Sequence, residues 1–97
     1  MTGTSRTTEG LDQRRRRTLY QAWHRGTREM DLLLGRFADD VIDDLSDAEL
    51  ADFEALMDVP DHDLFGWICG RSDVPPNYDT ALFGRIVGFH ASNRVLR

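Results

Sequence analysis

The stretch Trp23-His24-Arg25-Gly26-Thr27-Arg28-Glu29-Met30-Asp31 separates two helical patterns. Before it, Leu19, Ala22 and Trp23 recur at helical spacing. After it, apolar residues follow the i, i+3, i+4, i+7 rule of an amphipathic helix. These are Met30, Leu33, Leu34, Phe37, Ala38 and Val41. The sequence therefore predicts two amphipathic helices joined by a tight turn.

The turn carries ordinary signals for the end of one helix and the start of the next. Gly26 suits a left-handed residue that ends the first helix and lets the chain reverse. Thr27 can cap the second helix, and Glu29 lies in its first turn, where a carboxylate favours the positive end of the helix dipole. We expect a helix–turn–helix corner that presents Arg25, Arg28 and Glu29 together. The need to end one helix and begin the next would by itself explain why these residues occur here.

Two segments of the chain resemble a known family. The run from Leu19 to Ala38 resembles the succinate dehydrogenase assembly factors, the bacterial SdhE family and its mitochondrial relatives. Their hallmark, Arg-Gly-x-x-Glu at a helix junction, is matched by Arg25, Gly26 and Glu29. The segment Asp63-Leu64-Phe65-Gly66-Trp67-Ile68 is similar to the family's acidic-Leu-Phe-x-Trp segment. The resemblance covers about residues 14–90.

The resemblance implies a binding function. Members of this family bind the flavoprotein subunit of succinate dehydrogenase, and of related fumarate reductases, and promote covalent attachment of FAD to a histidine of that subunit. It implies that the corner is the contact surface, and the expected contact residues are Trp23, His24, Arg25, Gly26, Arg28, Glu29 and Asp31. His24 departs from the family pattern, because many bacterial relatives carry arginine there. No cofactor is assigned to the chain itself.

Length and composition predict one small domain. The chain has 97 residues, and we expect a disordered tail at 1–10 followed by a helical domain at 11–97. The single cysteine, Cys69, suits a reducing compartment. There is no apolar run long enough for a membrane span and no secretory signal. We expect a bacterial cytoplasmic protein; a mitochondrial transit peptide is the rival reading of the tail, weakened by Glu9 and Asp12.

Charge is unevenly distributed along the chain. Residues 1–36 hold eight arginines and four acids, whereas residues 37–79 hold one arginine and thirteen acids. Such asymmetry can orient an approaching protein partner. Arg14–Arg17 could suggest a nucleic-acid binder, but consecutive residues spread around a helix and the domain as a whole is acidic. We therefore expect the first helix to be solvated, and we expect no nucleic-acid partner.

Patterns along the chain predict an all-α bundle of five helices. Ser46 and Glu49 form a capping box, and Asn77 can cap the last helix. Gly84 and Gly88 would leave a shallow groove where another helix can approach. The expected helices span 11 or 12 to 25, 27 to 43 or 44, 47 to about 59, 61 to about 69, and 78 onward.

No active site is evident, which points to an interaction module and not an enzyme. The three histidines are far apart in sequence, and the acids at 39–44 lack the spacing of a calcium loop. No metal site is expected, and the free protein is expected to be a monomer. The alternative function is an antitoxin-like regulatory protein that binds through the acidic surface from Asp39 to Asp63. Charge reversal at Asp43 and Asp44 would separate the two functions.

Overall fold

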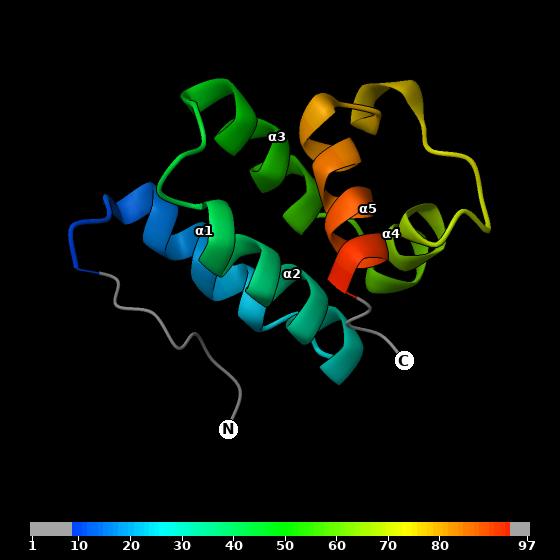
Figure 1. The fold of residues 1–97 in the computed structure, drawn as a ribbon, viewed down its shortest axis with the longest axis horizontal. Helices are drawn as coiled ribbons and strands as arrows, with labels where there is room; N and C mark the ends of the chain where they lie inside the picture. Colours follow the sequence, from blue (N-terminus) through cyan, green and yellow to red (C-terminus); the bar gives the residue numbers. More distant parts are fainter. Residues whose placement is uncertain (1–8, 94–97) are drawn as a thin grey trace.

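The protein is all-α, as the sequence predicted (Figure 1). The computed structural model describes residues 9–93, and within this range it contains five α-helices and one short 3-10 helix. They are α1 (Gln13–Trp23), α2 (Arg28–Val41), α3 (Asp47–Met57), α4 (Asp61–Ile68), η1 (Pro76–Tyr78) and α5 (Ala81–Asn93). Most of the predicted 1–10 tail lies outside the described residues. None of the helices in the described range is long and apolar enough to cross a membrane.

Helices α1 and α2 lie side by side and are joined by the predicted turn (Figure 1). Asp12 caps α1 by accepting a hydrogen bond from the backbone N–H of Arg15 (2.7 Å). Thr27 caps α2 by accepting from the N–H of Met30 (3.3 Å). Helix α1 ends at Trp23, earlier than the predicted Arg25, because His24 already has non-helical torsion angles (φ −129°, ψ 55°). The Thr27 cap is thus confirmed, whereas the predicted end of the first helix lies two residues too late.

Trp23 fixes how closely α1 and α2 approach. Its side chain is buried, and its indole N–H donates to Asp39 Oδ1 (3.1 Å). The ring lies against Gly35 of α2, where a Cβ atom would come within 2.2 Å of Trp23 Cδ2. Tyr20, one turn earlier on α1, is 62% exposed. Of these two aromatic residues of α1, Trp23 therefore belongs to the core and Tyr20 to the surface.

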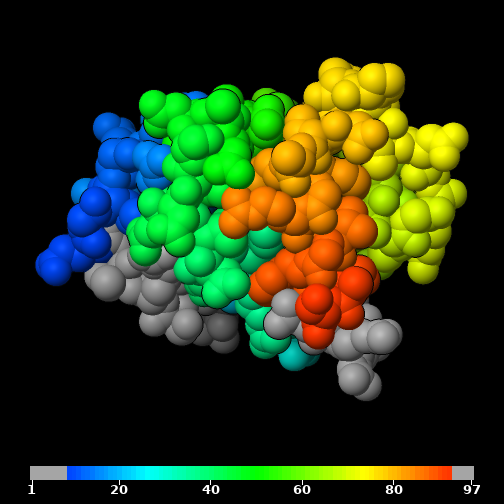
Figure 2. Space-filling view, turned by 45° about the horizontal axis from the view of Figure 1, so that its top comes forward, coloured from blue at the N-terminus to red at the C-terminus, as the bar shows by residue number. Residues whose placement is uncertain are grey.

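The core is organised around α2, which packs on α1, α3 and α5. Phe37 of α2 makes edge-to-face contacts with Phe53 of α3 and Phe89 of α5, each with ring centroids 5.6 Å apart. In Figure 2, α5 (orange to red) lies between α3 (green) and α4 with its following loop (yellow-green to yellow). The fully buried side chains in this core include Leu19, Leu33, Leu34, Phe37, Ile42, Leu50, Phe53, Leu56, Leu64, Leu82 and Ile86. Burial of these side chains supplies the main stabilising term for a fold of this size.

The arginines of α1 bind within the molecule, so the expectation of a solvated run is wrong for two of them. Arg14 pairs with Glu54 of α3, its Nη2 lying 2.8 Å from Oε1. Arg15 donates to the backbone carbonyls of Ile42 and Leu45, at 3.1 and 2.5 Å, in the loop between α2 and α3. These side chains tie the first helix to the start of the acidic half of the chain.

Two expectations for the second half need correction. The Ser46–Glu49 capping box is present, as predicted. Asn77, however, lies in η1, and α5 starts at Ala81 with Thr80 Oγ1 accepting from the N–H of Phe83 (3.1 Å). Gly84 and Gly88 are exposed, and a Cβ atom on either would meet nothing within 4 Å. Within the described range, no other helix uses the predicted groove.

Candidate partner-binding surface

The corner between α1 and α2 is held in shape by a buried carboxylate. Gly26 has φ +112°, a conformation that side chains of L-residues rarely adopt. Asp31, in the first turn of α2 and 8% exposed, accepts hydrogen bonds from the backbone N–H groups of Arg25 (2.5 Å) and Gly26 (3.3 Å). The carboxylate therefore satisfies two donors that the turn would otherwise leave unpaired.

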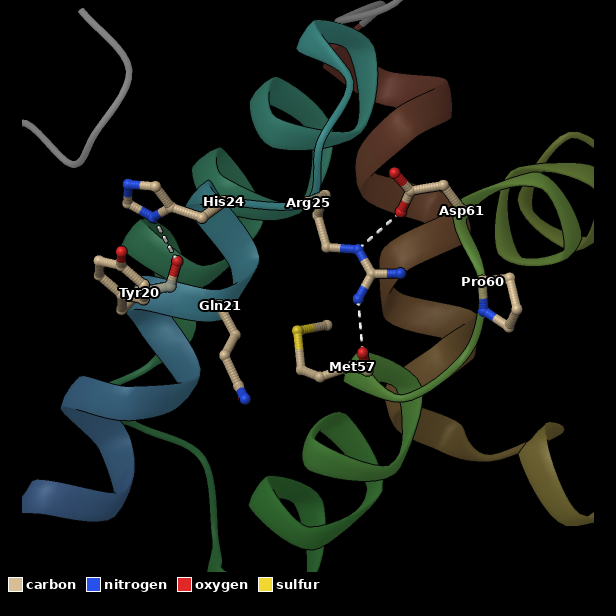
Figure 3. Close-up of a pocket in the computed structure, with 7 residues that line it drawn as sticks. All are labelled: Tyr20, Gln21, His24, Arg25, Met57, Pro60 and Asp61. Carbon is tan, nitrogen blue, oxygen red and sulfur yellow. Dashed lines mark hydrogen bonds and ion pairs between the residues drawn. The ribbon is translucent and has the colours of Figure 1, made fainter.

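The side chain of Arg25 points into the molecule, where it joins the corner to the elbow between α3 and α4 (Figure 3). It is only 7% exposed, and its Nε donates to Asp61 Oδ1 (2.7 Å). Its other nitrogens donate to the carbonyl oxygens of Met57 (2.7 Å) and Val59 (2.5 Å). Carbonyls at a helix C-terminus lack partners within the helix, so Arg25 satisfies them from the neighbouring corner. The expectation that Arg25 is presented together with Arg28 and Glu29 is wrong.

The outer face of the corner carries a stacked pair of rings. Tyr20 and His24 lie with centroids 3.9 Å apart and an interplanar angle of 16°. His24 Nδ1 is 2.7 Å from the carbonyl oxygen of Tyr20 (Figure 3). Because a carbonyl oxygen only accepts, Nδ1 carries the hydrogen and Nε2 is left for a partner. The pair therefore presents an aromatic edge with a polar group, as is common at interface anchors.

Two shallow pockets flank Asp61. The first, of about 410 Å³, is lined by Tyr20, Gln21, His24, Arg25, Met57, Pro60 and Asp61 (Figure 3). The second, of about 320 Å³, is lined by Thr27, Glu29, Met30, Asp61, His62 and Phe65. Neither pocket collects metal ligands, since no group of three His, Cys, Asp or Glu side chains within residues 9–93 could hold an ion. Asp61 therefore lies between two hollows of the same surface.

The seven predicted contact residues divide into an outward and an inward set. His24, Gly26, Arg28 and Glu29 are exposed. Trp23, Arg25 and Asp31 have their side-chain polar groups bound to Asp39, to the α3–α4 elbow and to the turn backbone. The inward set therefore supports the corner.

Sequence reasoning missed the second side of the surface. Asp61, His62 and Phe65 come from α4, and Asp61 is 36 positions beyond its ion-pair partner Arg25. No periodicity or local spacing signals such a pair. The only available signal was the second segment of family resemblance, which begins beside these residues and contains Phe65.

A family model described as "Flavinator of succinate dehydrogenase" matches residues 16–90. The match runs from within α1 through most of α5 and includes the residues that line both pockets. The chain belongs to this family. This confirms the resemblance found on the Arg-Gly-x-x-Glu corner and the α4 segment.

Relatives of the flavinator family come from bacteria and from mitochondria. The chain is 38% identical over 79 residues to the FAD assembly factor SdhE of Acetobacter pasteurianus, covering 81% of this chain and 72% of that protein. It is 37% identical over 83 residues to the mitochondrial succinate dehydrogenase assembly factor 2 of Dictyostelium discoideum, covering 86% of this chain and 58% of that protein. For the corresponding protein of Meyerozyma guilliermondii the identity is 42% over 71 residues, covering 73% of this chain and 53% of the relative. The chain thus spans between about half and three-fifths of these two mitochondrial relatives.

Proposed function

We propose that this protein binds the flavoprotein subunit of succinate dehydrogenase and promotes covalent attachment of FAD to it. Family membership names the process. The observation that carries the proposal is the position of Glu29. Its carboxylate is exposed and has no hydrogen bond or ion pair among the described residues. The turn beside it is held in place by the hydrogen bonds of Asp31 and Arg25. The corner therefore offers an unpaired acid on a rigid support. A fumarate reductase flavoprotein is a second client of the same kind.

The proposed mechanism acts through the conformation of the client. In covalent flavinylation the cofactor supplies most of the chemistry, and protein groups hold the reacting histidine and the flavin ring in register. A partner that binds the reactive arrangement more tightly than others increases its population. Asp31 and Arg25 fix the corner before the encounter, so little conformational entropy is lost on docking. Glu29, Arg28 and the Tyr20–His24 pair would make the contacts.

In this proposal the protein works by binding and not as a catalyst. It is a monomer when free and acts in the bacterial cytoplasm before the membrane complex assembles. The FAD belongs to the client, and the small protein holds no cofactor of its own. The exposed members of the corner are sufficient for this role.

The test is a comparison of two charge-neutral substitutions on the same helix. The flavoprotein subunit is co-expressed with the unsubstituted chain, with Glu29→Gln or with the control Asp40→Asn, which removes an exposed acid near the other end of α2. Covalent flavin is measured by mass spectrometry of the flavin-bearing peptide. We expect Glu29→Gln to lower flavinylation at least fivefold and Asp40→Asn to leave it unchanged. Equal flavinylation with all three chains would contradict the proposal.

A further inference from the structure

We propose that the pocket between the N-termini of α2 and α4 receives a basic side chain, arginine or lysine, from the client flavoprotein. This inference rests on the proposed function and names the chemistry of one contact. The pocket has a volume of about 320 Å³ and is lined by Thr27, Glu29, Met30, Asp61, His62 and Phe65. Its geometry combines an apolar floor with acidic groups.

The floor suits the aliphatic part of a long basic side chain. Met30 is 2% exposed, and Phe65 is half-buried and packs against the core. Lysine and arginine side chains bury their methylene groups along apolar surfaces while the charged end stays near water or a partner. A pocket that is open to solvent and apolar at its base accommodates that arrangement. A purely polar side chain would leave the base uncovered.

The acidic groups supply acceptors for the charged end. Glu29 has both carboxylate oxygens unpaired among the described residues. Asp61 uses Oδ1 for Arg25, and Figure 3 shows its other oxygen turned away from the guanidinium. Hydrogen bonds between a carboxylate and a guanidinium or ammonium group are among the stronger ones in proteins. The unpaired carboxylate of Glu29, with the second oxygen of the Arg25-bound Asp61 as a further acceptor at the same pocket, therefore favours a cation.

The nearby cations leave Glu29 unneutralised. Arg25 offsets the charge of Asp61 and also donates to two carbonyls, so its guanidinium is not available to Glu29. Arg28 immediately precedes Glu29 on α2, and adjacent residues on a helix do not face each other. Arg71 lies over the Phe65 ring at 5.3 Å, in an adjoining pocket that it lines with Phe65. That contact shows that the Phe65 ring binds a guanidinium on the side that faces the adjoining pocket.

The helix N-termini do not reverse this preference. Their positive ends would attract an anion if nothing else were present. The first turns of α2 and α4, however, already hold Glu29, Asp31, Asp61 and Asp63. These four carboxylates offset the dipoles, and only His62 adds a titratable cationic group to the pocket lining. A basic occupant remains the favoured one.

The experiment changes the charge at the pocket rim in both directions. His62 is exposed and has no hydrogen bond or ion pair among residues 9–93, so His62→Glu and His62→Lys alter charge without removing one. Ala51→Glu and Ala51→Lys, on the exposed face of α3, are matched controls. Binding of each chain to the purified flavoprotein subunit is measured by calorimetry at 0.15 M and 0.5 M NaCl.

We expect His62→Glu to tighten binding about threefold to tenfold and His62→Lys to weaken it by a similar factor, with smaller effects at high salt because ions screen the charges. The Ala51 variants should change binding less than twofold. Reversed signs would indicate an acidic occupant, and equal weakening by both His62 variants would indicate an apolar one; either result, or no change, overturns this inference alone. If the unsubstituted chain does not bind the flavoprotein, the proposed function falls as well.

Discussion

Two glycines near the corner are required for different reasons. Gly26 has a positive φ of +112° with open space around it, since the nearest atom to an added Cβ is Asp61 Oδ2 at 4.0 Å. Gly35 has helical torsion angles but no space, because the Trp23 ring lies against it. A substitution at each position therefore tests a separate physical cost: backbone strain at one, steric overlap at the other.

Gly35→Ala should be strongly destabilising. Its Cβ would lie 2.2, 2.5 and 2.7 Å from three atoms of the Trp23 ring, so α1 must move away from α2 or the indole must leave its site. Overpacking of a core costs about 1–3 kcal/mol, and this overlap is at the upper end. The free energy of unfolding is measured by urea denaturation.

Gly84→Ala is the control. Gly84 is exposed in α5, and a Cβ atom there would meet nothing within 4 Å. The substitution should therefore stabilise the protein by about 0.5–1 kcal/mol. A neutral Gly35→Ala would mean that Trp23 does not pack as described.

Gly26→Ala should cost about 1–2 kcal/mol of stability through backbone strain alone. The new methyl group meets no atom closer than 4.0 Å, so the loss reflects the positive φ. Thermal unfolding of this variant, compared with the unsubstituted chain, measures that cost. A crystal structure or amide chemical shifts should show the change confined to the turn. Unchanged stability would indicate that the turn can adopt an ordinary conformation, contrary to the structure.

At the scale of elements, one arginine joins two helical pairs. Arg25 lies in the α1–α2 turn, and its side chain binds the carbonyls of Met57 and Val59 and the carboxylate of Asp61. The Arg-Gly-x-x-Glu hallmark thus divides into a supporting residue, Arg25, and an exposed one, Glu29. The supporting residue places α4, and with it His62 and Phe65, beside the corner.

Arg25→Lys should loosen the α3–α4 elbow although it preserves the charge. A lysine ammonium is a compact point charge and cannot reach three acceptors in the arrangement used by the planar guanidinium. We expect a loss of about 2–4 kcal/mol, because buried acceptors and a partly buried carboxylate lose their donors. Hydrogen exchange of α4 amides should rise more than that of α1 amides. Arg28→Lys, at an exposed position, should change stability by less than about 0.5 kcal/mol; equal effects of the two substitutions would argue against the bridging role.

What the sequence predicts well are the local features of the elements. Caps at Thr27 and Ser46 and the apolar face of α2 each depend on residues a few positions apart. Pairs such as Arg25–Asp61 and Arg14–Glu54 are separated by 36 and 40 positions. Their formation depends on how helices cross, which periodicity does not determine. The exposed half of the candidate surface was therefore predictable, whereas its supporting half and the α4 side were not.

On the scale of the whole molecule, ion pairs within the fold neutralise part of the charge asymmetry along the chain. Arg14 and Arg25 from the basic first third pair with Glu54 and Asp61 from the acidic middle. Arg85 from the last helix pairs with Glu49 at 3.0 Å. The ion pairs thus connect the three charge segments of the sequence. Ionisation of these carboxylates therefore contributes to the stability of the domain.

The whole-molecule prediction is loss of stability in acid. The side-chain hydrogen bond from Arg14 lowers the pKa of Glu54, and the backbone N–H of Ser46, helped by Arg85, lowers that of Glu49. A carboxyl group with a lower pKa in the folded state binds protons more readily when unfolded, so stability is present above the ordinary glutamate pKa of about 4.3 and is lost as pH falls through the folded value. Urea midpoints should therefore drop between pH 5 and pH 3. Glu54→Gln should flatten that drop, by an amount on the order of 0.2–1 kcal/mol for a partly exposed pair. Asp44→Asn, which removes an exposed carboxylate, should leave the slope unchanged; an equal flattening by both variants would show that net charge, and not the Arg14–Glu54 pair, sets the acid sensitivity.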